Sequence, residues 1–104
     1  MVLYVMKWNV HPDKVEEYTQ WTQSAIGRTM AVPGVVEFRA YRPASGWAQV
    51  VATYEFADLA AWAAFYAHPD VRDVTSELRT LTTNVTTEVW GPSPVVPEPI
   101  RPGG

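Results

Sequence analysis

Two histidines are the only side chains of this 104-residue chain whose ordinary pKa lies near neutral pH, and each precedes a proline. A neutral imidazole is a common general base in enzymes. His68 is the better candidate for a catalytic base, because it would lie beside an aromatic helix face. That face is formed by Trp62, Phe65 and Tyr66. The alternative for His68, and the stronger interpretation for His11, is a polar cap at a helix end, where backbone groups lack partners.

Large aromatic side chains are the second group that could carry function. With one methionine, they fall on the apolar faces of the expected strands and helices: Tyr4, Met6, Trp8, Phe38, Tyr54, Trp62, Phe65 and Tyr66. Such a set forms either an ordinary core or the wall of a substrate pocket with a few polar groups. We predict that these residues line a pocket for a small aromatic ligand, with a plain core as the alternative.

Other kinds of site find no support in the sequence. The chain has no cysteine, which excludes disulfides, iron–sulfur clusters and cysteine-ligated zinc. Neither histidine has a carboxylate three or four residues away, and no glycine-rich phosphate loop is present. The net charge of −3 gives no electrostatic attraction to nucleic acid or to an anionic membrane. We therefore expect no metal, no cofactor, no nucleic-acid partner and no membrane association.

No targeting segment is recognisable, so a cytoplasmic protein is expected. The amino terminus lacks the basic region of a signal peptide. The longest apolar run covers residues 59–67, about half the length that a membrane-spanning helix needs.

The elements that would position the candidate residues follow from hydrophobic periodicity and from proline and glycine positions. Strands are expected at residues 2–10, 35–42, 47–56 and 82–90, and helices at about 12–30, 59–67 and 70–81. A four-residue loop, 43–46, would join the second and third strands as a hairpin. The last segment, 91–104, contains five of the nine prolines and would form an extended Pro-rich arm.

The order of these elements is β-α-β-β-α-β, which predicts the α+β class and a ferredoxin-like fold over residues 1–90. In this fold a four-stranded antiparallel sheet carries its helices on one face. The other face would be unusually apolar, with charged residues between the apolar ones: Leu3, Val5, Val35, Tyr41, Trp47 and Val51 beside Lys7, Glu37, Arg39 and Glu55. Large apolar faces are usually covered, and a homodimer that packs sheet against sheet would cover this one.

Three segments carry a recognisable pattern: VHPDKVEEY at the end of the first strand, VPGVVEFRAYR around the Pro-Gly turn, and ATYEFADLAAWAAFYAHPDVRDV over the third strand and the broken helix. They resemble the dimeric α/β barrel superfamily, and most closely its antibiotic biosynthesis monooxygenase branch. The resemblance covers residues 1 to about 90 and implies a barrel formed by two copies. Haem-degrading members carry an asparagine, a tryptophan and a histidine where this chain has Met6, Phe65 and Thr75. The resemblance therefore does not extend to haem degradation.

The resemblance implies a small dimeric monooxygenase-like protein that oxidises an aromatic or polyketide-like compound, of the quinol or anthrone type, without a cofactor. His68 would remove a proton from the substrate, and the aromatic pocket would exclude water. Two alternatives stay open. One is a non-catalytic dimer that binds a small ligand or acts as an interaction module, and the other is a cyclase or isomerase that uses the same pocket.

Overall fold

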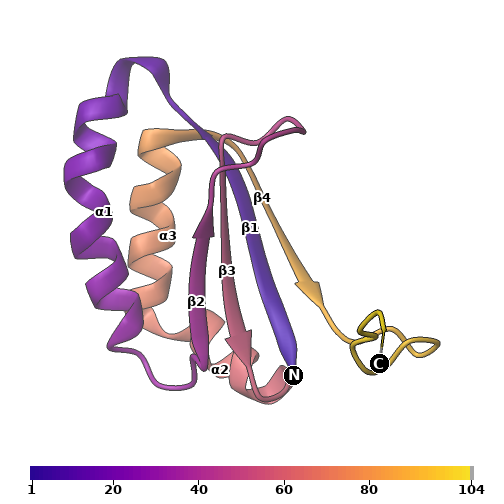
Figure 1. Cartoon of the computed structure of the whole chain (residues 1–104). Coiled ribbons are helices and arrows are strands. Elements are labelled where there is room, and N and C mark those ends of the chain that lie inside the picture. Colours follow the sequence, from indigo (N-terminus) through magenta and orange to yellow (C-terminus); the bar gives the residue numbers. More distant parts are fainter. Residues whose placement is uncertain (104) are drawn as a thin grey trace.

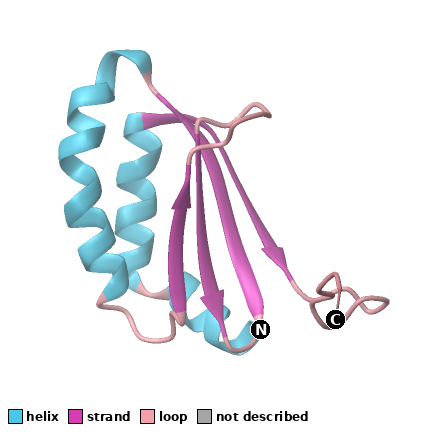
Figure 2. Ribbon diagram, viewed as in Figure 1, coloured by secondary structure: helices cyan, strands magenta, loops and turns pink. Residues whose placement is uncertain are grey.

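The computed structural model describes residues 1–103, and it contains one sheet with helices on a single face (Figures 1 and 2). In chain order the elements are β1 (Val2–Val10), a 3₁₀ turn (Pro12–Lys14), α1 (Val15–Met30), β2 (Glu37–Tyr41), β3 (Val50–Phe56), α2 (Leu59–Ala67), α3 (Pro69–Leu81) and β4 (Thr82–Trp90). Hydrophobic side chains of α1 and α3 pack toward the sheet, which buries the centre of the domain between the two layers. The predicted ferredoxin-like fold is confirmed.

The sheet has the strand order β2-β3-β1-β4, and all neighbouring strands are antiparallel. Tyr4, Tyr54 and Phe38 lie opposite one another on three adjacent strands. Their rings contact in sequence, with centroids 6.0 Å apart for Tyr4 and Tyr54 and 4.9 Å apart for Phe38 and Tyr54. Cross-strand aromatic pairs of this kind fix the register of a sheet. The three rings therefore form a contiguous aromatic cluster on one face of the sheet.

Two helical segments begin with the same tripeptide, His-Pro-Asp. In each, the histidine Nδ1 accepts a hydrogen bond from the aspartate backbone N–H at 3.1 Å, from Asp13 to His11 and from Asp70 to His68. Proline then occupies the first helical position, where no backbone N–H is needed. The imidazole thus replaces the serine or aspartate that usually caps a helix.

The hairpin strands are shorter than the sequence suggests. β2 begins at Glu37 and β3 begins at Val50, so the loop runs over residues 42–49 in place of the expected four-residue turn. Gln49 fastens this loop to the end of β1: its side-chain Oε1 accepts from the N–H of Val10 at 2.8 Å, and its own N–H donates to Asn9 Oδ1 at 2.9 Å. The Gln49 N–H also donates to the Trp8 carbonyl oxygen at 3.2 Å, so these side-chain bonds extend the contact between the loop and β1. Sequence periodicity does not reveal them.

Two residues expected on the open face of the sheet therefore lie elsewhere. Trp47 belongs to the loop, where it is half exposed, and Val35 precedes β2 and packs against the core. The expectation that both contribute to the open face is wrong, because β2 begins after Val35 and β3 begins after Trp47.

Residues 91–103 form neither helix nor strand and fold back on themselves beyond the end of β4 (Figure 1). This arm is thus curled, whereas the sequence suggested an extended arm. Val95 and Ile100 are almost fully exposed on it, at 87% and 79%. Within residues 1–103, no helix is long and apolar enough to cross a membrane.

Candidate functional site

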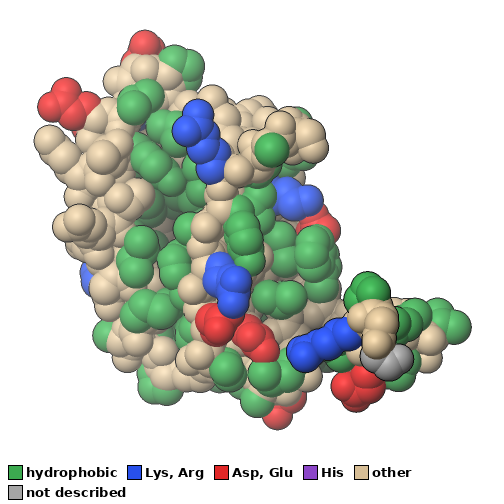
Figure 3. All heavy atoms as spheres, in the orientation of Figure 1, with side chains coloured by type: hydrophobic (Ala, Val, Ile, Leu, Met, Phe, Trp, Pro, Cys, Tyr) green, Lys and Arg blue, Asp and Glu red, His purple; other side chains and the backbone are tan. Residues whose placement is uncertain are grey.

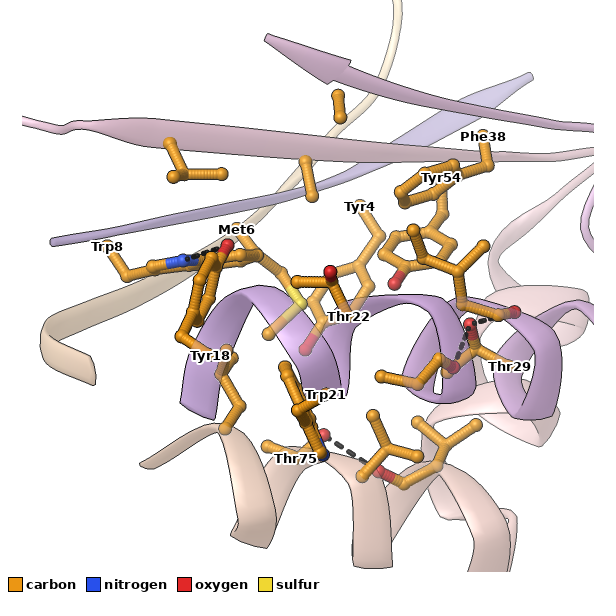
Figure 4. Close-up of a pocket in the computed structure, with 18 of the residues that line it drawn as sticks. Tyr4, Met6, Trp8, Tyr18, Trp21, Thr22, Thr29, Phe38, Tyr54 and Thr75 are labelled. Carbon is orange, nitrogen blue, oxygen red and sulfur yellow. Dashed lines mark hydrogen bonds between the residues drawn. The ribbon is translucent and has the colours of Figure 1, made fainter. Parts of the chain in front are cut away.

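A cavity of about 280 Å³ lies between the sheet and the helices. Six of the eight residues that the sequence assigned to a pocket line it: Tyr4, Met6, Trp8, Phe38, Tyr54 and Phe65. Figure 4 shows the labelled aromatic side chains of the strands projecting toward α1 and α3. The volume is close to the lower end of small-molecule pockets, roughly 300 Å³. The space therefore suits a compound of a few fused rings.

The cavity exists because small residues alternate with large ones around it. Ala25 of α1 and Ala52 of β3 are buried in its wall, and their short side chains leave the space that Trp21 and the strand aromatics enclose. Thr22 and Thr75 bring hydroxyl groups to the helical side. The sequence analysis missed these helical residues, although small and hydroxyl-bearing residues on a buried helix face were the available signal.

Neutral hydroxyl and indole groups supply the polarity of the wall. The indole Nε1 of Trp8 donates a hydrogen bond to the Tyr18 hydroxyl at 3.1 Å, drawn as a dashed line in Figure 4. Burial raises the pKa of Tyr18 and of Tyr54, and hydrogen bonds with Trp8 and Thr29 respectively oppose this rise. No carboxylate or imidazole occurs among the described residues that line the cavity. The indoles and threonine hydroxyls already donate within the protein, so the tyrosine hydroxyls are the wall groups that can donate to a ligand at neutral pH. The described wall offers no group that titrates there.

Tyr4 is almost completely buried, at 2% exposure. Burial, reinforced by the neighbouring Tyr66, raises the pKa of Tyr4 to about 12, while the positive charge of Arg72 opposes the rise. A phenol with this pKa stays protonated at physiological pH and acts as a hydrogen-bond donor. Its ring forms part of the cavity wall, so it is positioned by the same sheet register that aligns Tyr54.

An ion pair joins the two long helices beside the cavity. Glu77 of α3 accepts hydrogen bonds from both terminal nitrogens of Arg28, at 2.8 and 2.6 Å, and from the Trp21 indole at 2.8 Å. These bonds hold the pKa of Glu77 well below its usual range, at about 2, with Arg28 as the main cause. Because Trp21 lines the cavity, the ion pair also fixes one side of its wall.

Trp62 and Tyr66, the other two predicted pocket residues, do not line the cavity. Both belong to α2, and their rings lie 6.0 Å from that of Tyr4. This placement of Trp62 and Tyr66 goes with the break between the two helices, because α2 ends at Ala67 and α3 begins at Pro69. Trp62 packs against Tyr4 outside the cavity, while residues of α3 line the cavity.

His68, the predicted catalytic base, is not among the residues that line the cavity. Its ring is part of the α3 cap, and its Nδ1 lies 3.9 Å from a carboxylate oxygen of Asp70. The structure therefore shows His68 as a helix cap, and its catalytic role stays a prediction. Residues 1–103 contain no cluster of three or more histidine and carboxylate side chains that could hold a metal ion.

The face of the sheet opposite the helices carries an open hollow of about 410 Å³. Its wall combines apolar and charged residues from all four strands: Leu3, Val5, Glu37, Arg39, Tyr41, Val51, Thr53, Glu55 and Trp90. Lys7 and Glu88 form an ion pair of 3.7 Å at its border. In Figure 3, hydrophobic side chains over the strands lie between such acidic and basic groups. The predicted mixture of residues on this face is largely present, without Val35 and Trp47.

Comparisons of sequence and structure relate this fold to known proteins. The sequence profile of the antibiotic biosynthesis monooxygenase family matches residues 1–76. No curated protein matches the chain significantly. Among solved structures, the chain is similar to SnoaB, a cofactor-independent oxygenase from Streptomyces nogalater, with 20% identity, a TM-score of 0.72, and coverage of 93% of this chain and 97% of that one.

Two further structures show the same fold. A DABB family protein with a ferredoxin-like fold from Mesorhizobium loti has 21% identity and a TM-score of 0.78, with 88% of this chain and 96% of that one covered. A dimeric ferredoxin-like protein from Thermobifida fusca has 11% identity and a TM-score of 0.71, with coverage of 86% and 88%. At such identities these likenesses establish the fold alone. The family profile, which covers most of the folded domain, establishes that this chain belongs to the antibiotic biosynthesis monooxygenase family.

Proposed function

We propose that this protein binds a quinol- or anthrone-type aromatic compound in the cavity and oxidises it with O₂. The observation that carries the proposal is the aromatic cavity of about 280 Å³ between sheet and helices, whose wall is largely apolar and contains neutral tyrosine hydroxyls. A dry aromatic wall suits a planar fused-ring compound and keeps water away from a reactive intermediate. Membership of the antibiotic biosynthesis monooxygenase family and the likeness to SnoaB support the reaction class.

The reaction uses electrons of the substrate itself. An anthrone loses a proton from its methylene group, and the resulting carbanion, delocalised onto the carbonyl oxygen, transfers one electron to O₂. The substrate radical and superoxide combine, and the peroxide takes up a proton. Loss of water from this hydroperoxide leaves a carbonyl group, so one O₂ converts the methylene to a ketone and releases one water.

The protein's part in this scheme is to stabilise the delocalised anion. Neutral hydroxyl groups that are already oriented toward a developing negative charge lower its free energy. The hydroxyl of Tyr54 points from the sheet toward α1 (Figure 4), and its raised pKa keeps it protonated. The wall contains no base, which favours substrates that ionise readily. His68 remains the sequence-derived candidate for the base, and such a role requires its imidazole to leave the cap.

Oxygen uptake with anthrone tests the proposal. We expect one O₂ consumed per anthraquinone formed, and we expect Ala52→Trp to abolish uptake because the indole fills the cavity. Ala60→Trp on the exposed side of α2 is the matched control and should keep the activity. Anthrone binding without uptake would overturn the oxygenase and favour a ligand-binding protein, the second candidate, which the absence of a base in the described wall also favours.

We also propose that a second copy covers the open face of the sheet, as the sequence suggested. The hollow there combines apolar residues with both signs of charge, so a two-fold related copy can bury the former and pair the latter. A related fold from Thermobifida fusca is described as dimeric, which supports this arrangement.

A further inference from the structure

Four buried hydrogen-bond donors belong to side chains that are connected through ring contacts around Tyr4. They are the Tyr4 hydroxyl, the indole Nε1 of Trp62, and the Nε and Nη2 atoms of Arg72. None of the four has a hydrogen-bond partner among residues 1–103. Native proteins leave few buried polar groups unpaired, and each such group calls for a physical reason.

Ring contacts connect the three side chains. The ring centroids of Tyr4 and Trp62 are 6.0 Å apart. Tyr66 meets the ring of Tyr4 edge-on at 6.0 Å, and the guanidinium carbon of Arg72 lies 3.9 Å from the centre of the Tyr66 ring. The charge of Arg72 also acts on Tyr4, whose pKa it lowers against the larger effect of burial. One continuous cluster therefore spans β1, α2 and α3.

All members of this cluster donate hydrogen bonds, and one carries a permanent positive charge. The Nε and Nη2 atoms form one edge of the guanidinium group, and their N–H bonds point in parallel. This edge matches the two oxygens of a carboxylate, which it binds through two parallel hydrogen bonds. None of the described carboxylates forms an ion pair with Arg72, since Glu77 is engaged by Arg28 and Asp70 lies against His68.

We propose that Arg72, Tyr4 and Trp62 form a subsite for a carboxylate group carried by the aromatic compound that the cavity binds. The inference rests on the proposed function and names its substrate class, an aromatic carboxylic acid. Tyr4 links the two sites, because its ring is part of the cavity wall and its hydroxyl belongs to the donor cluster. The guanidinium of Arg72 stacks on the ring of Tyr66, a side chain that reaches the surface, and in this proposal a ligand gains access to Arg72 when that ring moves.

Two matched ligands test this assignment: anthraquinone-2-carboxylate and anthraquinone-2-carboxamide, with affinities measured by calorimetry. The wild-type chain should bind the acid at least about tenfold more tightly than the amide, as expected for charge-assisted bonds to a guanidinium. Arg72→Met, which removes the guanidinium and its charge, should bring the ratio close to one, because the acid loses far more affinity than the amide. Arg42→Gln, an exposed arginine of the loop 42–49, should preserve the preference.

Two further variants keep the test decisive if Arg72→Met unfolds. Arg72→Lys retains the charge without the parallel N–H pair, so its preference should fall well below that of the wild type. Trp62→Phe removes the indole donor while keeping an aromatic ring, and it should reduce the preference by a smaller factor. A full preference in both variants would overturn the subsite.

The ligand pair also separates this inference from the proposed function. Equal affinities of the wild-type chain for the acid and the amide would overturn the carboxylate subsite, while binding in the cavity would stand. If neither compound binds, both proposals fail.

Discussion

The two faces of the sheet differ in composition: strand residues on the helix side are mostly apolar or aromatic, whereas the opposite face mixes apolar with charged residues. On the helix side, Tyr4, Tyr54 and Phe65 are almost fully buried and line the cavity. On the opposite side, Val5 is buried by its strand neighbours, whereas Tyr41 and Trp90 are about half exposed around an open hollow. The helix side is covered by helices of the same chain. On the open side, Tyr41 and Trp90 have no such layer within residues 1–103, and we propose that a second copy supplies it.

The largest expected effect concerns the open face. Val51→Lys puts a charge in the hollow opposite Lys7 of β1, where a second copy would have to bury two like charges. We expect the wild-type chain to have twice the 11.6 kDa mass of one chain in solution and the variant to have the single-chain mass. Light scattering at micromolar concentration measures this. Leu59→Lys, at an exposed position of α2, is the control, and a wild-type monomer would contradict the two-layer interpretation of this face.

The substitution Phe65→Ala tests how strongly the packing on the helix side stabilises the chain. Phe65 is 1% exposed and contacts the rings of Tyr54 and Phe56, so its loss should lower the free energy of unfolding by about 3–5 kcal/mol. Urea unfolding should show this loss at every protein concentration, because the contacts lie within one chain. A loss that appears only in dilute solution would mean that the helix side also depends on a partner.

Glu77→Gln tests the ion pair that joins α1 and α3 on the helix side. The pKa of Glu77 is lowered from 4.5 to about 2 in the folded chain, so its stabilising effect is present above pH 4.5 and disappears as the pH falls through 2. Urea unfolding between pH 2 and pH 7 should show the wild type more stable than the variant near neutrality. The difference should shrink below pH 4.5, and a difference that does not vary with pH would contradict the role of the carboxylate.

The smallest effects are expected at the two histidine caps. His68→Ala and His11→Ala should each cost about 0.5–2 kcal/mol, the usual range for a lost helix cap, in thermal unfolding. Asparagine caps helices well and has no basic group, so His68→Asn should restore stability. If capping is the whole role of His68, this variant keeps full oxygen uptake. Loss of uptake in His68→Asn, but not in His11→Asn, would identify His68 as the base.

Local sequence signals were sufficient for most of the fold. The composition and apolar pattern of residues 2–10 and 82–90 indicated β1 and β4 with their observed bounds, and the two His-Pro-Asp segments marked helix starts. The hairpin loop is longer than predicted, and Gln49 at its end bonds to Val10 and Asn9 of β1, 39 and 40 positions away. Such long-range bonds leave no pattern within a short window of sequence.

The candidate site could be predicted only in part, for a similar reason. Strand alternation placed Tyr4, Met6 and Tyr54 on the helix side, and the structure brings all three to the cavity. The same alternation says nothing about how α2 and α3 pack, so Trp62 was assigned to the cavity although it lies beyond Tyr4.

The sequence by itself determined the order of the elements, the helix starts and which strand residues share a face, because these follow from local backbone preferences and a period of two along a strand. Only the tertiary structure decided where empty space remains and which polar groups are unpaired. The cavity depends on Ala25 and Ala52 from different layers, and the donors around Arg72 come from three separate elements. Both depend on distances between residues far apart in the chain, which the packing of the whole domain determines.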